Sequence, residues 1–306
     1  MQDIIAVILT KDEEIHIARC IASVRQVCRE VLVVDSYSTD KTCDIARSMG
    51  ARVVQHPFSC QAEQFNWAID NVPIDTEWIW RVDADEIIEV PLVRLAEEQL
   101  PKWTARQSSS SNAQQINGVY VNKKIVFMGR PLMHGGWYPA PQIKVIRRGF
   151  GRSEDKLMDE HLIITSGQTA QWNADQTDWN LKPLDWWWDK HRGYARREAL
   201  MQVCAERDAM SFHAESDRPH AASAEVNGRL TGTDAERKRW MKNLYGHCPR
   251  YLRAVVYFIA RYILLGGFLD GYAGWYWHTR QGLFYRLMVD REIGRLRKES
   301  TELLKN

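Results

Sequence analysis

Residues 78–86, Trp-Ile-Trp-Arg-Val-Asp-Ala-Asp-Glu, decide how the first half of this 306-residue chain is interpreted. The run 78–82 is mostly apolar, which predicts a strand buried on both faces of a sheet. Two carboxylates, Asp83 and Asp85, follow with one residue between them. Such a pair can hold a hard divalent cation and the hydroxyls of a sugar. Alone the pattern is weak, since short acidic triplets also occur on solvated loops.

Two further apolar runs precede this stretch, at residues 4–9 and 30–35. Helical spacing over residues 13–27, and a polar cap opening residues 39–49, predict helices between the strands. The alternation predicts a parallel sheet with right-handed crossovers, in which ligands bind at the carboxyl ends of the strands. Acidic residues lie at or after those predicted ends, namely Asp12, Asp35, Asp83 and Asp85.

The charge balance changes along the chain. Residues 1–180 hold 19 Lys and Arg against 24 Asp and Glu, whereas residues 181–306 hold 22 against 15. The first part continues with partly alternating runs at 118–127 and 142–147, typical of mixed or antiparallel strands. The second part is aromatic and helical in pattern. We therefore predict an α/β domain over residues 1–180 and a helical region over residues 181–306.

The region around residues 237–261 combines cations with apolar side chains. It holds seven Lys and Arg and no Asp or Glu, and it overlaps an apolar stretch at 254–269 that Arg261 interrupts. That stretch is too short and too charged to span a bilayer, which takes about 20 mainly apolar residues. We therefore expect residues 237–290 to lie at a membrane surface, with cations toward anionic head groups. A buried helical hairpin that closes the domain is the alternative.

Location and partners follow from composition. The six cysteines form no Cys-x-x-Cys pair, which favours reduced structural thiols. The amino terminus lacks the pattern of a secretory signal, so we expect a cytoplasmic protein, peripheral at the inner face of the cytoplasmic membrane. The net charge is only +2 and the basic segment lies among apolar residues, which argues against nucleic-acid binding. The oligomeric state stays open.

Four motifs together carry a resemblance to a known family. They are Val7-Ile8-Leu9-Thr10-Lys11-Asp12-Glu13-Glu14, Val33-Val34-Asp35-Ser36-Tyr37-Ser38-Thr39-Asp40-Lys41-Thr42, Gln64-Phe65-Asn66-Trp67-Ala68 and Val82-Asp83-Ala84-Asp85-Glu86. With them the chain resembles inverting family 2 glycosyltransferases, which have the GT-A fold, a Rossmann-like mixed sheet that binds a nucleotide sugar. Among these it is most similar to bacterial lipopolysaccharide-core and exopolysaccharide transferases.

The resemblance implies roles for individual residues. Thr10, Asp12 and Asp35 would line the pocket for the nucleotide base, Asp83 would meet the ribose or donor sugar, and Asp85 would bind the Mg²⁺ or Mn²⁺ that bridges the two phosphates. A cation there stabilises the charge that the leaving nucleoside diphosphate gains. Asp12 stands where the family commonly has Asn, and Phe65 stands where a basic residue is common.

An inverting transfer also needs a carboxylate that accepts the proton of the acceptor hydroxyl. Glu160, with Asp159 beside it, matches the position where such families carry this base; a solvated turn is the alternative reading. His161 and His191 could each approach the metal or a diphosphate. For His191, the recurrence of Trp187, Tyr194 and Met201 equally predicts a packed helix position.

The sequence thus predicts a metal-dependent transferase that moves a sugar from a nucleotide-diphosphate sugar, with a UDP-sugar favoured, to a hydroxyl of a lipid-linked, lipopolysaccharide or exopolysaccharide acceptor. Two alternatives remain. A nucleotidyltransferase can use a related α/β sheet, although no glycine-rich, cationic phosphate loop is visible near the amino terminus. A non-catalytic peripheral membrane scaffold is the other.

Overall fold

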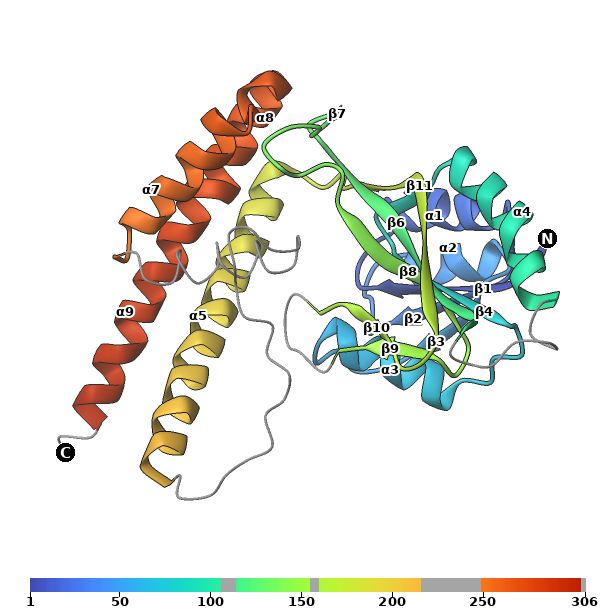
Figure 1. Ribbon diagram of the computed structural model, residues 1–306, viewed down its shortest axis with the longest axis horizontal. Coiled ribbons are helices and arrows are strands. Elements are labelled where there is room, and N and C mark those ends of the chain that lie inside the picture. Colours follow the sequence, from blue (N-terminus) through green and yellow to red (C-terminus); the bar gives the residue numbers. More distant parts are fainter. Residues whose placement is uncertain (106–113, 155–159, 216–248, 304–306) are drawn as a thin grey trace. The chain divides into compact units, whose positions relative to one another are not determined.

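The computed structural model describes residues 1–105, 114–154, 160–215 and 249–303, and the chain divides into two compact units. The first unit is Met1–Lys182 and the second is Pro183–Asn306. The division lies two residues beyond the boundary expected between residues 180 and 181. Figure 1 shows a mixed β-sheet with helices against it in the first unit and long helices in the second. The predicted α/β region followed by a helical region is confirmed.

The first unit is built on one mixed sheet. Its parallel half contains β1 (Gln2–Thr10), β2 (Cys28–Asp35), β3 (Arg52–Gln55) and β4 (Trp78–Asp83), in the order β3-β2-β1-β4. Its other half continues from β4 through β8 (Pro141–Arg147), β6 (Ile116–Phe127) and β11 (Gln168–Trp179) to β5 (Glu86–Ile88), with β7 (Arg130–Pro131) paired to β6. A small separate sheet pairs β9 (Gly151–Ser153) with β10 (Leu162–Ile164).

Helices cover both faces of the parallel half, which is why its strands are apolar on both sides. One core cluster includes side chains of α1 (Ile17–Val24), α2 (Thr42–Ser48) and α4 (Val90–Ala105). The other cluster joins the opposite sheet face to α3 (Gln61–Asn71). Trp78 and Trp80 are fully buried in the first cluster, so the apolar run 78–82 belongs to a central strand, β4.

Helix α2 begins later than the sequence predicted. We expected it from residue 39, but it starts at Thr42. The Ser38 N–H and hydroxyl are bound to the Asp35 carboxylate, and the Thr39 N–H donates to Asp12 Oδ1 at 2.7 Å. Asp40 instead accepts from the Thr42 N–H at 2.9 Å. Ser38 and Thr39 are therefore used in the turn before the helix, and of the three polar residues expected to cap it Asp40 binds its first N–H.

The second unit is helical throughout its described residues. Its elements are α5 (Leu184–Glu215), α7 (Leu252–Phe258), η3 (Ile259–Leu264), η4 (Gly267–Asp270), α8 (Gly271–Trp277), η5 (His278–Phe284) and α9 (Tyr285–Leu303). Helices α5 and α9 pack through Ala195, Ala199 and Val203 against Tyr285, Val289 and Ile293. Asp290, fully buried, accepts from the Arg253 guanidinium and ties α9 to α7.

Within the described part of the chain, no single helix is long and apolar enough to cross a membrane. Leu252–Leu264 and Gly267–Glu299 pass that length and composition test together, as a pair bent by 70°.

His278 makes the stability of the second unit depend on pH. Burial, together with the nearby charge of Arg261, lowers the pKa of His278 to about 4. The unfolded histidine binds a proton below about pH 6.5, while the buried one stays neutral, so stability is present above that pH and falls as the pH drops toward 4. Between pH 7 and pH 5 the loss is about 2 kcal/mol.

Chemical denaturation at the two pH values checks this. We expect the loss of unfolding free energy to be smaller by that amount in His278→Gln than in the wild type. The exposed His134 provides the control, and His134→Gln should lose as much as the wild type. Equal losses in His278→Gln and the wild type would contradict the assignment.

Candidate active site

The register of the parallel strands brings three predicted site residues to one level. Thr10 at the end of β1 is the partner of Asp35 at the end of β2, and Leu9 is the partner of Asp83 at the end of β4. Asp35 and Asp83 therefore flank the end of β1 from the two neighbouring strands. This is the carboxyl edge of the sheet, where ligands bind in folds of this kind.

Asp35 is a buried carboxylate held by hydrogen bonds. Its Oδ2 accepts from the Ser38 N–H at 2.9 Å and from Gln55 Nε2 at 3.0 Å, and its Oδ1 accepts from the Ser38 hydroxyl. Burial by itself would raise the pKa of Asp35, but these hydrogen bonds outweigh it and the pKa lies below its usual value. Asp35 is thus a fixed anion at neutral pH.

Asp12 braces the turn that follows Asp35. Its backbone is left-handed, with a φ of 52°, which Asp and Asn tolerate better than other side chains. Its Oδ1 accepts from the Thr39 N–H at 2.7 Å, and its own N–H donates to the Ser38 hydroxyl at 2.8 Å. Either an Asp or an Asn oxygen can accept that bond, so the residue type expected from the family and the one present both fit this geometry.

Thr10 offers a buried polar atom to a ligand. Among the described residues its Oγ1 has no hydrogen-bond partner. A buried hydroxyl without a partner is costly unless a ligand or water satisfies it. The position therefore fits the predicted contact with a nucleotide base.

The Asp83–Asp85 turn rests on a fully buried carboxylate, Glu86. The Asp83 N–H donates to Glu86 Oε2 at 2.8 Å, and Lys144 Nζ lies 2.8 and 2.9 Å from the two Glu86 oxygens. Gln176 Nε2 also donates to Glu86, and its amide oxygen accepts from Trp80 Nε1 at 2.9 Å. The turn is thereby fastened to β8 and β11.

The second carboxylate of the turn, Asp85, has partners of its own. Its Oδ2 accepts from Asn180 Nδ2 at 2.9 Å, and its carbonyl accepts from the Trp179 N–H at 3.0 Å. No group of three or more His, Cys, Asp and Glu able to hold a metal occurs in the ranges that the structure describes. Mg²⁺ bound to a nucleotide commonly takes only one or two carboxylates, with phosphates and water as the other ligands, so the turn fits such an ion.

Glu160 is paired with Arg81, a residue to which the sequence analysis gave no role. Arg81 Nη2 lies 2.9 Å from Glu160 Oε1, and both side chains are almost completely buried. The Arg81 guanidinium also lies over the Phe65 ring, 5.6 Å from its centroid. A cation is thus present beside Phe65, although β4 and not α3 supplies it.

The other predicted residues are distributed as follows. Asp159 lies outside the described residues. His161 is exposed, and its N–H donates to Glu154 Oε2 at 3.4 Å. His191 belongs to the second unit, where its Nδ1 is 2.7 Å from the Trp187 carbonyl and burial lowers its pKa. The roles proposed for these three residues stay predictions.

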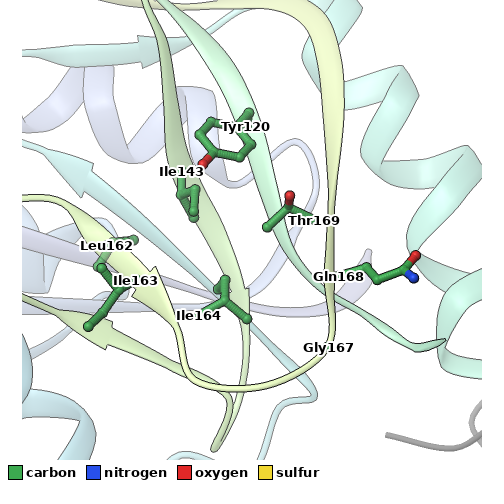
Figure 2. A pocket seen from close by; sticks show the side chains of 8 residues that line it. All are labelled: Tyr120, Ile143, Leu162, Ile163, Ile164, Gly167, Gln168 and Thr169. Atoms are coloured by element: carbon green, nitrogen blue, oxygen red, sulfur yellow. The ribbon is translucent and has the colours of Figure 1, made fainter. Parts of the chain in front are cut away.

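A hollow of about 640 Å³ lies on the face formed by β6, β8 and the start of β11. Figure 2 shows Tyr120, Ile143 and Ile164 in its wall, with Gln168 pointing away from them. Leu162, two residues after Glu160, is also part of the lining. One part of its lining therefore follows the candidate base directly in sequence.

Lys144 and Arg81 were missed because their partners are remote in sequence. Each is a charged residue with apolar neighbours on both sides in its strand, and that is the signal by which they could have been found. A buried cation needs a carboxylate partner. The sequence does not say which one.

Comparison with known proteins shows which family this part of the chain resembles. Residues 5–100 match the model of glycosyl transferase family 2. An uncharacterised glycosyltransferase of Rickettsia typhi is 41% identical over 86 residues, which is 28% of this chain and 29% of that protein. The lipopolysaccharide core biosynthesis glycosyltransferase LpsC of Rhizobium meliloti is 27% identical over 170 residues, 54% of this chain and 58% of LpsC.

Among solved structures, glucosyl-3-phosphoglycerate synthase from Mycobacterium tuberculosis, in complex with Mn²⁺, UDP and phosphoglyceric acid, has a TM-score of 0.38 and 20% identity, covering 60% of this chain and 72% of that one. The chain covers less than a third of the Rickettsia protein and under two thirds of LpsC. Residues 5–100 thus match a family 2 glycosyltransferase domain, as the motifs predicted. Its mixed sheet, with acidic residues at the carboxyl edge, is GT-A-like.

Lys144→Met should destabilise the first unit, because it leaves Glu86 buried without its cation. The expected loss is about 3–5 kcal/mol of unfolding free energy, the range for a broken buried ion pair. Denaturant titration measures it, and Lys144→Met combined with Glu86→Gln should recover part of the loss. The exposed pair of Lys102 and Glu98 gives the control, and Lys102→Met should cost less than about 1 kcal/mol. Similar losses in the two single variants would refute the role of Glu86.

Proposed function

We propose that the chain transfers a sugar, with inversion and with the help of a divalent metal, from a nucleotide-diphosphate sugar to an acceptor hydroxyl. The observation that carries the proposal is the alignment of Thr10, Asp35 and Asp83 at one sheet edge, inside a family 2 domain. A UDP-sugar is the favoured donor.

Donor binding would use the carboxyl edge of β1, β2 and β4. The ionised Asp35 suits the polar edge of a base, as does the Thr10 hydroxyl, which has no partner in the part of the chain that the structure describes, and Asp12 holds the turn beside them. Asp83 would accept from ribose or sugar hydroxyls. Asp85 would hold Mg²⁺ or Mn²⁺, whose charge stabilises the departing diphosphate.

Proton transfer would fall to Glu160. Inversion requires the acceptor oxygen to attack the anomeric carbon from the face opposite the diphosphate while a carboxylate takes its proton. Arg81 engages Oε1 of Glu160 and would fix its orientation, and the acceptor hydroxyl would approach Oε2. The hollow on β6, β8 and β11, which Leu162 helps to line, is where we place the acceptor.

The acceptor would be lipid-linked, or a lipopolysaccharide or exopolysaccharide intermediate, reached at the inner face of the cytoplasmic membrane. The name of the LpsC relative supports this assignment, as does the basic, aromatic character of the helical region. His191 would approach a pyrophosphate from that region. Detergent, and not salt alone, should then release the protein from membranes.

Nucleotide binding is the first test. Thermal-shift titrations with UDP, GDP and dTDP, each with Mn²⁺ or with EDTA, should show metal-dependent stabilisation by one nucleotide, because a ligand that binds only the folded state raises its melting temperature. Asp85→Ala should lose that shift. Asp44 is an exposed carboxylate on α2, and Asp44→Ala should keep it. Binding of no nucleotide would leave the scaffold alternative.

Turnover is the second test. Glu160→Gln removes the proton acceptor but keeps the shape of the side chain, so the transfer rate should fall about 10²-fold or more while nucleotide affinity is unchanged. Asp159→Asn, assayed in parallel, decides between the two neighbouring carboxylates. Full turnover in both folded variants would exclude this base assignment.

A further inference from the structure

The second unit presents an apolar hairpin end. Element η3 leads through a turn into η4 and α8, and the four large side chains at this turn are at least half exposed: Leu264 (77%), Leu265 (55%), Phe268 (50%) and Leu269 (61%). Figure 1 shows α8 at one end of the helices of this unit. Soluble surfaces rarely gather so many large apolar side chains in one place without a partner.

The exposure is imposed by close packing inside the hairpin. A Cβ added to Gly274 would lie 2.4 Å from the Gly267 carbonyl oxygen, and one added to Gly267 would lie 2.3 Å from His278 Nε2. Ala273, Trp277 and His278 are buried behind the turn. Because that interior is already filled, the four side chains cannot fold inward.

An apolar stripe continues from the turn along one face of α7 and η3. Leu252, Val255, Val256, Ile259 and Ile263 are exposed and are spaced at helical intervals. On the other side of the turn, Tyr272 and Trp275 are exposed and stacked with their ring centroids 5.5 Å apart. Tyr and Trp are the residues that favour the boundary between lipid and water.

The charges around this surface have one predominant sign. Residues 249–285 contain Arg250, Arg261 and Arg280, besides Arg253, which is paired with the buried Asp290, and their single acidic residue, Asp270, is buried. Arg280 lies over the rings of Tyr276 and Phe284, at 5.4 Å from each centroid, so this cation is packed among aromatic side chains. A bilayer with anionic head groups complements this combination.

We propose that Leu264, Leu265, Phe268 and Leu269 insert into the interface of an anionic bilayer, with Tyr272 and Trp275 at the head-group level. The inference deepens the proposed function, since it names the surface by which the chain meets the membrane. The bilayer is favoured over a second protein copy because the apolar residues form the end of a hairpin flanked by cations and interfacial aromatics.

Vesicle co-sedimentation of the full chain tests the proposal. The wild type should bind vesicles of phosphatidylcholine mixed with phosphatidylglycerol more tightly than vesicles of phosphatidylcholine alone. Leu264→Glu combined with Leu269→Glu should weaken binding to the mixed vesicles about tenfold or more, since it places two charges where acyl chains would lie. Ile15 and Phe58 are about half exposed in the first unit, so Ile15→Glu with Phe58→Glu is the control for two added charges and should bind as the wild type does.

Nucleotide binding separates this proposal from the proposed function. The variant that combines Leu264→Glu with Leu269→Glu, here called the hairpin variant, should keep the Mn²⁺-dependent rise in melting temperature with nucleotide. Loss of vesicle binding with that rise intact supports insertion. Lipids brominated on their acyl chains should quench the tryptophan fluorescence of the wild type more than that of the Trp275→Phe variant.

Three results would overturn the insertion. They are full vesicle binding by the hairpin variant, complete release of the wild type from vesicles in salt, and a wild-type dimer in light scattering that the hairpin variant converts to a monomer. The last result would mean that a second copy covers the surface.

Discussion

The buried pair of Glu86 and Lys144 is the interaction on which the turn at the carboxyl edge of the sheet depends. Glu86 is shielded completely from water, yet it receives the Asp83 N–H, the Lys144 ammonium and the Gln176 amide. Such a charge is tolerated only because every one of these donors is in place. The turn that carries Asp83 and Asp85 therefore cannot move without breaking contacts to two other strands. On the proposed function, a site preorganised in this way would not need to rearrange when charge develops on the leaving group.

Much of this edge could be predicted because it is encoded locally. The apolar runs gave the positions of β1, β2 and β4, and the acidic residues follow those strands directly in sequence. The register then brings Thr10, Asp35 and Asp83 together, as a parallel sheet requires. The family motifs added the expectation of a nucleotide-sugar ligand, which spacing alone does not contain.

The remaining features depend on contacts between distant segments. Arg81 meets Glu160 across 79 residues of sequence, and Lys144 meets Glu86 across 58. Local propensity also misplaced the start of α2, because Ser38 and Thr39 bind Asp35 and Asp12 instead of capping the helix. In each case a tertiary hydrogen bond or ion pair overrides a local preference, and a single sequence does not reveal the partner.

Strand β4 carries both Arg81 and Asp83, and this limits how such an enzyme could diversify. Arg81 and Asp83 are two residues apart on one strand, so they project to the same side of the sheet, roughly 7 Å from each other. One rigid segment thus sets both the partner of the base and the edge of the donor pocket. On the proposed function, stereochemistry would be inherited with β4, while acceptor choice could vary in the segments around it. Recombination of this domain with other helical regions would then change the product and preserve the anomeric outcome.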